Sequence, residues 1–408
     1  MKKVLYLSYD GLTDPLGQSQ ILPYLIGLTK AGYQFTIISF EKPERFGSGA
    51  ATIERLCKEH QIEWRPLPYT KFPPVLSTVK DIRKLRKEAK RVLQQGGYQI
   101  VHCRSYITAL AGLWLKRTMG VKMVFDMRGF WADERVDGGL WNLKNPLYRT
   151  IYRYFKKKEL QFFKEADYTI SLTHQAKAEI LSWKALQHHS IPVQVIPCCV
   201  DLDLFSRKNV SEKQIATIKE TLQIPAGSFV ISYVGSIGTW YMLDEMLLFF
   251  KEVVQEYPNA ILLFVTKENK DDIWSAAVRA GIAQHNIRIT ESARNDMPAY
   301  IASSHCSLFF IKPAFSKKAS SPTKQGEIMA MGIPVICNDN VGDTSYVVEH
   351  YHSGVVFKEF KPEAFRKALA AIRNTSFSPE EIRKGAMDFY ALEKGVESYK
   401  QVYEKIVA

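Results

Sequence analysis

The chain has 408 residues, of which 46% are hydrophobic and 24% charged, and its net charge is +13. This composition excludes a disordered or fibrous protein, and the length predicts two domains of about 200 residues rather than one core. No apolar run is long enough to span a membrane, and the first one stops at Asp10, too early for a signal peptide. We therefore expect a soluble, cytoplasmic protein.

The positive charge is concentrated in the first half of the chain. Residues 1–200 contain 31 Lys and Arg against 17 Asp and Glu, a net charge of +14, whereas residues 201–408 have a net charge of −1. A basic half predicts an anionic partner such as nucleic acid, a membrane surface or a phosphate-bearing acceptor. The six cysteines have no metal-ligand spacing, so we expect reduced thiols.

The first half alternates expected strands with expected helices, which is typical of a parallel sheet. The strands are expected at Val4–Ser8, Phe35–Phe40, Ile100–His102, Met123–Phe125, Tyr168–Leu172 and Val193–Ile196. Gly17 and Gln18 begin the first expected helix, where backbone N–H groups can approach a phosphate or a sugar. The glycine spacing is not the dinucleotide fingerprint, so a nicotinamide site is disfavoured.

Polar residues follow two of these expected strands. His102 ends one strand, and Asp126 and Arg128 follow the next. Ligands of open α/β sheets bind outside the carboxyl ends of the strands, so these residues are expected at a cleft. A lone histidine is usually structural, but the dense charge after Phe125 needs a partner.

Two basic stretches are expected to be helical. The first, 80–95, reads as a solvated charged face. The second, 148–164, mixes aromatic residues with cations, which indicates either contact with an anionic membrane or an amphipathic helix whose aromatics enter the core. Together with the charge asymmetry, we favour membrane contact.

The second half repeats the alternation after an extended crossing at 195–205. Asp201 and Asp203 lie in this crossing and are discounted as a metal site, because no third ligand is nearby. Strands are expected at Phe229–Val234, Ile261–Val265, Ile287–Thr290, Ser307–Ile311 and Ile333–Cys337. The backbone N–H groups of the glycine loop at Gly235 and Ser236 could close on a diphosphate. The ends of the other strands carry the cations Lys267, Arg294 and Lys312, and Met297 opens the helix after the third strand.

A short helix is expected from Ser321 to Gly332. Ser321 is expected to cap it, Pro322 to occupy its first position, and Gly332 to end it in a left-handed conformation. Lys324 lies in the first turn, and Glu327 is about 4.5 Å further along the axis. A carboxylate beyond a cation suits a nucleoside diphosphate, although an ordinary capped surface helix has the same pattern.

The chain resembles the family-four retaining glycosyltransferases of GT-B architecture, of the bacterial surface-polysaccharide type. The resemblance rests on Ser321-Pro322-x-Lys324-x-x-Glu327-x-Met329-Ala330-x-Gly332-x-Pro334-Val335-Ile336, on Val195-Ile196-Pro197…Val200-Asp201-x-x-x-Phe205 and on Tyr233-Val234-Gly235-Ser236. It implies an α/β fold of two Rossmann-like parallel-sheet domains facing across a cleft. Residues 1–200 would bind the acceptor, with helix 390–408 packed back on them, and residues 201–389 would bind a nucleotide-sugar.

The resemblance also implies roles for single residues. Glu327 would hold the ribose hydroxyls, Lys324 with Ser320 and Ser321 the diphosphate, and Gly17 would lie near the donor phosphates. Arg294 and Met297 belong to the 293–297 loop, which would lie near the base. Three features depart from the family. Its first motif glutamate is Ala319 here, and a histidine often found in the first domain is Arg128. The usual Arg and Lys of the second-domain glycine loop are replaced around Ser236 and Trp240-Tyr241.

The sequence thus predicts metal-independent, retaining transfer from a UDP- or GDP-sugar to a saccharide or lipid-linked saccharide in cell-surface glycan biosynthesis, without a cofactor. Lys324 and Arg128 would stabilise the leaving diphosphate, and His102 and Asp126 would position the acceptor. The enzyme would work in the cytoplasm, peripherally on the inner face of the cell membrane. The alternatives are a sugar-nucleotide epimerase of the same fold and a basic membrane or nucleic-acid adaptor, although no nucleic-acid motif is present.

Overall fold

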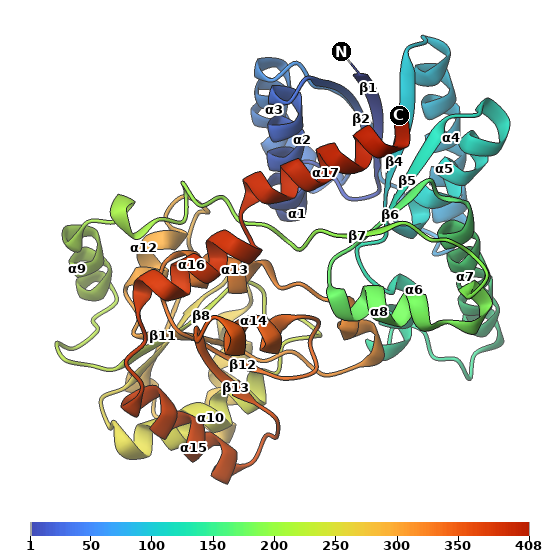
Figure 1. Ribbon diagram of the computed structural model, residues 1–408. Coiled ribbons are helices and arrows are strands. Elements are labelled where there is room, and N and C mark those ends of the chain that lie inside the picture. The colour runs from blue at the N-terminus through green and yellow to red at the C-terminus, as the bar shows by residue number, and fades with distance from the viewer. Residues whose placement is uncertain (1, 408) are drawn as a thin grey trace. The chain divides into compact units, whose positions relative to one another are not determined.

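The computed structural model describes residues 2–407. The chain divides into two compact units between Pro197 and Cys198 and again between Ala391 and Leu392. Unit 1 contains the segments before the first and after the second division, and unit 2 contains the segment between them. The last helix therefore belongs to the same unit as the first strand (Figure 1).

Unit 1 is built on a seven-stranded sheet in which neighbouring strands run parallel. Its strands are β1 (Lys2–Ser8), β2 (Tyr33–Glu41), β3 (Glu63–Pro68), β4 (Tyr98–Arg104), β5 (Lys122–Asp126), β6 (Tyr168–Ser171) and β7 (Val193–Val195). They lie in the order β3-β2-β1-β4-β5-β6-β7, so the direction of winding reverses between β1 and β4.

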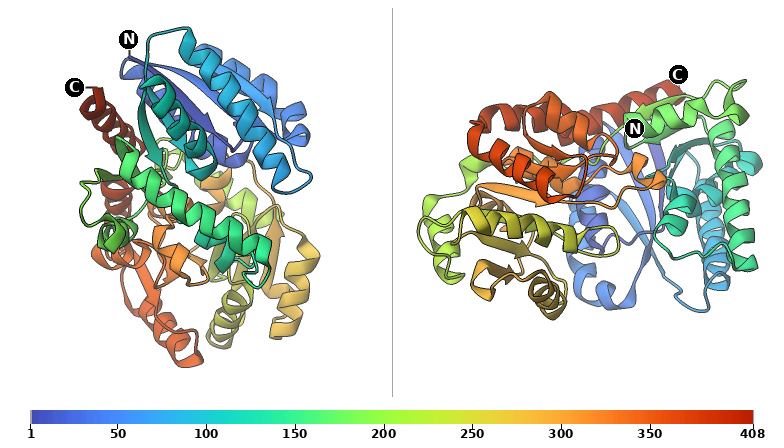
Figure 2. Two further views of the ribbon diagram at one scale, coloured as in Figure 1. Left: turned by 90° about the vertical axis from the view of Figure 1, so that its right-hand side faces the viewer. Right: turned by 90° about the horizontal axis from the view of Figure 1, so that it is seen from below.

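Helices cover both faces of this sheet (Figures 1 and 2). They are α1 (Pro15–Gln20), α2 (Leu22–Lys30), α3 (Pro43–Glu59), α4 (Leu76–Gln94), α5 (Ser105–Met119), α6 (Trp131–Asp137), α7 (Pro146–Glu165), α8 (His174–Ser182), the 3-10 helix Lys184–Leu186 and α17 (Leu392–Val407). Right-handed crossovers place α2 and α3 on one face and α4, α5 and α7 on the other. The terminal helix α17 packs against α2.

Unit 2 has a six-stranded parallel sheet of the same kind. Its strands are β8 (Val230–Val234), β9 (Ile261–Val265), β10 (Ile287–Thr290), β11 (Cys306–Phe309), β12 (Val335–Asn338) and β13 (Gly354–Phe357). The order is β10-β9-β8-β11-β12-β13, which reverses between β8 and β11. The expected α/β fold with two Rossmann-like parallel sheets is confirmed.

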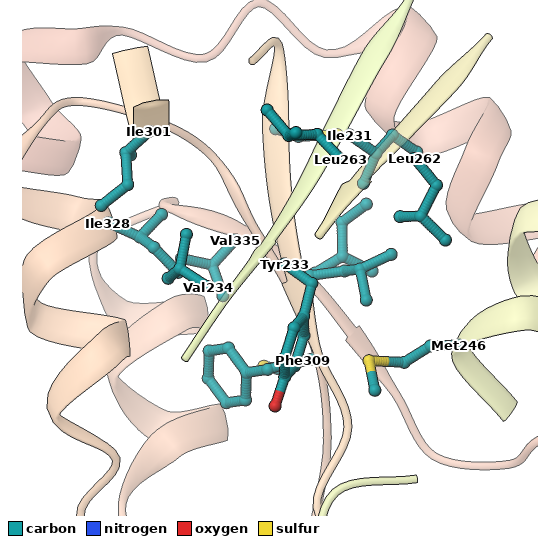
Figure 3. Close-up of a cluster of buried hydrophobic side chains, with 14 of the residues drawn as sticks. Ile231, Tyr233, Val234, Met246, Leu262, Leu263, Ile301, Phe309, Ile328 and Val335 are labelled. Carbon is teal, nitrogen blue, oxygen red and sulfur yellow. The ribbon is translucent and has the colours of Figure 1, made fainter. Parts of the chain in front are cut away.

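The helices of unit 2 follow its strands in alternation. They are α9 (Glu212–Thr221), α10 (Leu243–Glu256), α11 (Lys270–Ala280), α12 (Met297–Ala302), α13 (Thr323–Ala330), α14 (Thr344–His350), α15 (Pro362–Asn374) and α16 (Pro379–Phe389), with 3-10 helices at Arg207–Asn209, Gln284–Asn286 and Phe315–Ala319. Every residue of β8 and β9 is buried, because helices cover both faces of the sheet. Figure 3 shows part of this core, in which Tyr233, Phe309 and Met246 accompany aliphatic side chains.

The aromatic residues of the basic stretch 148–164 are divided between the core and the surface. Phe155, Phe162 and Phe163 on α7 are buried, whereas Tyr154 is 47% exposed. Packing into the core, the alternative to membrane contact, is therefore right for these three phenylalanines. Among residues 2–407, no helix has both the length and the apolar character needed to cross a bilayer. All six cysteines are buried, and no disulfide joins any of them.

Candidate functional site

The point of reversal in unit 2 brings together two loops and one helix. The chain leaves β8 at Gly235, whose φ of +101° suits glycine, and it leaves β11 toward α13. Open α/β sheets bind their ligands at such a point of reversal, outside the carboxyl ends of the strands. The glycine loop 235–242 and the start of α13 lie at this reversal.

Lys324 is the central cation of this region. It lies in the first turn of α13 and is buried, and its Nζ donates a hydrogen bond of 2.9 Å to the Tyr233 hydroxyl. The same nitrogen is 3.6 Å from the ring centroid of Tyr241 and 4.1 Å from that of Tyr233. A side chain at Gly235 would lie 3.5 Å from it, so the glycine leaves the loop backbone beside the lysine. The ammonium group therefore sits in an aromatic cage against the glycine loop.

Burial is the main influence on the pKa values in this cage. It lowers the pKa of Lys324 well below the usual range, and the nearby Glu327 opposes this shift. Burial also raises the pKa of Tyr241 to about 12, so its hydroxyl stays protonated at neutral pH. A poorly hydrated ammonium group gains from any anion that reaches it, because the anion replaces the lost water.

Glu327 and Arg294 form a pair beside Lys324. The Nη1 atom of Arg294 donates to the carboxylate of Glu327 over 2.9 Å, and the guanidinium lies 5.2 Å from the ring centroid of Phe205. The side chain of Glu327 is 9% exposed and that of Arg294 38% exposed. The structure thus brings Lys324, Glu327 and Arg294 together at one place. The carboxylate of Glu327 is held by an arginine that lies 33 positions away in the sequence.

The expected cap of α13 is wrong in detail. The helix begins at Thr323 with Pro322 as its N-cap residue, and no side chain caps it. Ser321 instead accepts a hydrogen bond of 3.1 Å from the backbone of Cys198, and Ser320 is partly exposed before it. Pro322 has an extended backbone with ψ of 116°, which moves the helix start one residue onward. The expected end is confirmed, since Gly332 has φ of +71°.

The remaining expected donor-binding residues of unit 2 lie at the ends of neighbouring strands. Ser236 donates to Glu268 over 2.7 Å, while Lys267 and Lys312 are exposed after β9 and β11. Met297 is the first residue of α12. Asp201, discounted as a metal ligand, accepts hydrogen bonds of 3.0 Å from the backbone of Asp203 and Leu204.

Sequence reasoning missed the aromatic residues that hold the lysines. In the sequence, Trp240 and Tyr241 stand out only as replacements for family cations. In the structure, the ring of Tyr241 covers Lys324, and the ring centroid of Trp240 is 3.6 Å from Nζ of the buried Lys317. The available signal was the pair of adjacent aromatics directly after a glycine loop.

In unit 1, His102 and Asp126 are buried beneath the terminal helix. The Nδ1 atom of His102 is 2.7 Å from the Tyr403 hydroxyl, and its Nε2 atom is 3.4 Å from Asp126. The Tyr399 hydroxyl donates to the same carboxylate over 3.0 Å. His102 is 1% exposed and Asp126 is 0% exposed. Tyr403 and Tyr399 of α17 thus take up hydrogen-bonding atoms of both side chains, and a role of His102 and Asp126 in positioning the acceptor stays a prediction.

For Asp126 and His102 alike, burial and the neighbouring charges of opposite sign shift the pKa in opposite directions. Burial alone would raise the pKa of Asp126, but Arg128, His102 and Arg104 bring it below its usual value. Burial lowers the pKa of His102, against the pull of Asp126. Because an ionised carboxylate only accepts, neutral His102 carries its proton on Nε2 and accepts from Tyr403 through Nδ1.

Arg128 lies at the end of this cluster. Its backbone is left-handed, with φ of +56°, and its Nη1 atom is 3.8 Å from Asp126. A left-handed arginine is strained, and such strain is common at functional sites.

Gly17 and Gln18 serve packing at the start of α1. A side chain at Gly17 would lie 2.3 Å from the carbonyl oxygen of Gly11, so only glycine fits against that loop. The side chain of Gln18 donates to the carbonyl of Thr13 over 3.2 Å. The carboxylate of Glu41 holds the same loop by accepting from the backbone of Leu12 and Thr13 at 2.8 and 3.1 Å.

Comparison with known proteins gives matches to both halves of the chain. Residues 24–204 match the model of Glycosyltransferase Family 4, and residues 214–388 match that of Glycosyl transferases group 1. No curated protein sequence matches the chain.

Three solved structures show the same fold over nearly the whole length. A glycosyltransferase from Rickettsia africae has a TM-score of 0.74 at 15% identity, covering 100% of this chain and 99% of that one. Anabaena Alr3699/HepE in complex with UDP has a TM-score of 0.67 at 14% identity, covering 98% and 99%. WaaG, a glycosyltransferase involved in lipopolysaccharide biosynthesis, has a TM-score of 0.64 at 14% identity, covering 96% and 97%.

Proposed function

Because the chain belongs to the family-four-like glycosyltransferases of GT-B architecture, we propose that it transfers a sugar, with retention of configuration, from a nucleoside-diphosphate sugar to a saccharide or lipid-linked saccharide. The donor is a UDP- or GDP-sugar, and a structural relative solved with UDP supports the first. The product belongs to a cell-surface glycan, made in the cytoplasm at the inner face of the membrane.

The observation that carries this proposal is the caged lysine at the point of reversal in unit 2. Lys324 is buried with its ammonium group against Tyr241 and the glycine loop, at the mouth of α13. The first N–H groups of a helix and a lysine together form a site for phosphate. The Arg294–Glu327 pair lies beside it, where the carboxylate accepts hydrogen bonds from ribose hydroxyls.

The proposed reaction depends on stabilising the negative charge that develops on the departing diphosphate. The bond between the anomeric carbon and the diphosphate oxygen breaks through an oxocarbenium-like state, and negative charge grows on that oxygen. Lys324 and the N-terminus of α13 stabilise this charge without a metal ion. The acceptor hydroxyl then bonds to the anomeric carbon on the face that the diphosphate leaves, and its proton passes to the departing phosphate.

The predicted residues of unit 1 have two roles: Arg128 contacts a substrate, and His102 and Asp126 hold Arg128 in position. Arg128 contacts the acceptor or the departing diphosphate, which its fixed positive charge suits. His102 and Asp126 are positioning residues, because both are buried and Asp126 lies 3.8 Å from the guanidinium.

Thermal shift with UDP-, GDP-, ADP- and CMP-sugars tests the proposal. One nucleotide class should raise the melting temperature, because a ligand at a hundred times its Kd adds about 2.7 kcal/mol of stability. The identified donor is then incubated with saccharide acceptors, and NMR of the product should show the anomeric configuration of the donor. If no nucleotide-sugar stabilises the protein, the proposal fails. Conversion of a UDP-sugar without any acceptor would assign the chain to the epimerases instead.

A further inference from the structure

A compact set of exposed apolar side chains lies between β3 and the first turn of α4. Phe72 is 69% exposed, Val75 36%, Leu76 67% and Val79 41%. Singly exposed apolar residues are common on protein surfaces, but four within eight positions are not. We call Phe72, Val75, Leu76 and Val79 the apolar tip.

The base of the apolar tip is fixed. Asp81 is 0% exposed and accepts hydrogen bonds from the backbone and hydroxyl of Thr70, at 3.0 and 2.7 Å, and from the Tyr9 hydroxyl at 3.1 Å. At the tip itself, Val75 has φ of +70°, a strained conformation for a β-branched residue. The loop is therefore anchored, and it presents apolar side chains to solvent instead of folding them inward.

Cations surround the apolar tip. Residues 71–91 contain eight Lys and Arg and only two acidic residues, Asp81 and Glu88. Asp81 is buried, and Glu88 is held by Arg65 at 2.7 Å. The exposed side of α4 carries the following basic residues: Lys80, Arg83, Lys87, Lys90 and Arg91. This face of unit 1 is therefore apolar at one end and positive along its length.

The face continues onto α7. Helix α5 packs against both α4 and α7, and the charge of Arg86 on α4 acts on Tyr154 and Lys158 of α7. In a parallel sheet all crossover helices begin at the carboxyl edge of the strands. The apolar tip and the start of α7, with Leu147 56% exposed, therefore lie at the edge of unit 1 where α/β sheets bind their ligands.

We propose that the apolar tip and the basic face of α4 dock the protein on an anionic lipid bilayer. Large apolar side chains insert at the boundary of headgroups and acyl chains, while lysine and arginine remain among the anionic headgroups. Nucleic acid would also attract the cations, but it offers no apolar phase to cover Phe72 and Leu76. The membrane-binding surface then lies not on the aromatic residues of α7, three of which are buried, but on α4, whose sequence reads as a solvated charged face.

This surface deepens the proposed function and rests on it in one respect. If the acceptor is lipid-linked, docking by this edge brings the acceptor headgroup to the strand ends of unit 1. Binding to lipid itself needs neither donor nor acceptor, so the two proposals fail separately.

Sedimentation of the full chain with vesicles tests the inference. The protein should sediment with equimolar phosphatidylcholine and phosphatidylglycerol and remain in solution with phosphatidylcholine alone. Phe72→Ser with Leu76→Ser should lower the partition coefficient at least tenfold, because each side chain loses its apolar burial. Lys80→Glu with Arg83→Glu should lower it by more than about twentyfold, since each neutralised cation alone costs about fivefold.

Matched variants separate the surface from general effects. Val278→Ser with Leu248→Ser removes apolar side chains that are 74% and 47% exposed in unit 2, and Lys213→Glu with Lys358→Glu reverses two exposed cations there. Both should sediment like the wild type, and all variants should keep the wild-type melting temperature and nucleotide-induced shift. Equal sedimentation of the tip variants and the wild type would overturn the inference. So would tight binding to single- or double-stranded DNA without any binding to vesicles.

Discussion

Lys324 shows how burial can prepare a residue for an anionic ligand. Its ammonium group has exchanged water for the faces of Tyr233 and Tyr241 and one hydroxyl contact. Cation–π contacts return only part of the lost hydration energy. Under the proposed function, a diphosphate oxygen at the mouth of α13 supplies the missing negative charge.

Lys324→Met should therefore lower kcat by about 100- to 1000-fold, because one group that stabilises transition-state charge is lost. The free energy of unfolding should stay the same or rise, since methionine fills the stem's volume without a buried charge. Steady-state kinetics and urea unfolding measure the two effects, with Lys358→Met, an exposed residue of unit 2, as the control. A near-normal kcat in Lys324→Met would contradict the assignment.

Gly235 offers a second test at the same site. With φ of +101°, any side chain there is strained, and its Cβ would lie 3.5 Å from the ammonium of Lys324. Gly235→Ala should cost about 1–2 kcal/mol of stability and weaken nucleotide binding, as measured by urea unfolding and calorimetric titration. Gly238→Ala in the same loop is the matched control, because Gly238 is not among the positive-φ glycines. If both variants bind nucleotide like the wild type, the loop does not approach the phosphate.

At the scale of elements, the buried cluster beneath α17 makes unit 1 sensitive to acid. The ring of His102 stacks on that of Tyr6, with the ring centroids 4.4 Å apart. Burial lowers the pKa of His102, and the positive charges of Arg104 and Arg128 lower it further. Asp126, Tyr399 and Tyr403 complete its surroundings. The pKa of His102 is lowered in the folded state, so the unfolded chain binds the proton first, and acid favours unfolding.

This cluster predicts a pH window for stability. The contribution of His102 is complete above about pH 6.5, the pKa of an unfolded histidine, and is lost below it by up to about 1.4 kcal/mol per pH unit. His102→Gln should be less stable than wild type at pH 8 but should lose stability less steeply toward pH 5 in urea unfolding. His189→Gln, an exposed histidine of unit 1, should keep the wild-type slope. Parallel slopes for all three proteins would show that His102 does not titrate on unfolding.

Which elements the sequence predicts depends on where they lie in the sheets. Inner strands such as β1, β8 and β9 contain apolar runs, because both faces of each sheet are covered, and the sequence predicts all the inner strands. The two missed strands, β3 and β13, are at sheet edges. Pro66 and Pro68 lie within β3, and Gly354 begins β13; such residues are tolerated at an edge but argue against a strand in the sequence.

The sequence predicts which types of residue form the site, but not which of them contact each other. The anion-binding helix, its lysine and its glutamate follow from local spacing along the chain. The partners do not: Arg294 lies 33 positions from Glu327, and Tyr403 lies 301 positions from His102. These contacts exist because the sheet order and the return of α17 bring distant segments together, and no local pattern records that.

At the scale of the whole molecule, the chain closes unit 1 with its last helix. Gly27 on α2 is a point of close approach, where an added Cβ would lie 2.5 Å from a methyl group of Val396 on α17. The buried cluster of His102 and Asp126 depends on the same helix, because Tyr399 and Tyr403 complete it. Unit 1 is therefore complete only when α17 has packed onto it.

A double-mutant cycle measures this closure. Gly27→Ala should push α17 away from α2 and cost about 1–3 kcal/mol of unfolding free energy, as overpacking does. Val396→Ala removes the methyl groups that clash, so the double variant should recover part of that loss, with a coupling energy of about 0.5–3 kcal/mol. Urea unfolding of the four proteins gives the cycle. Strict additivity would mean that α17 moves freely on α2, and the acid sensitivity of His102 would then need another origin.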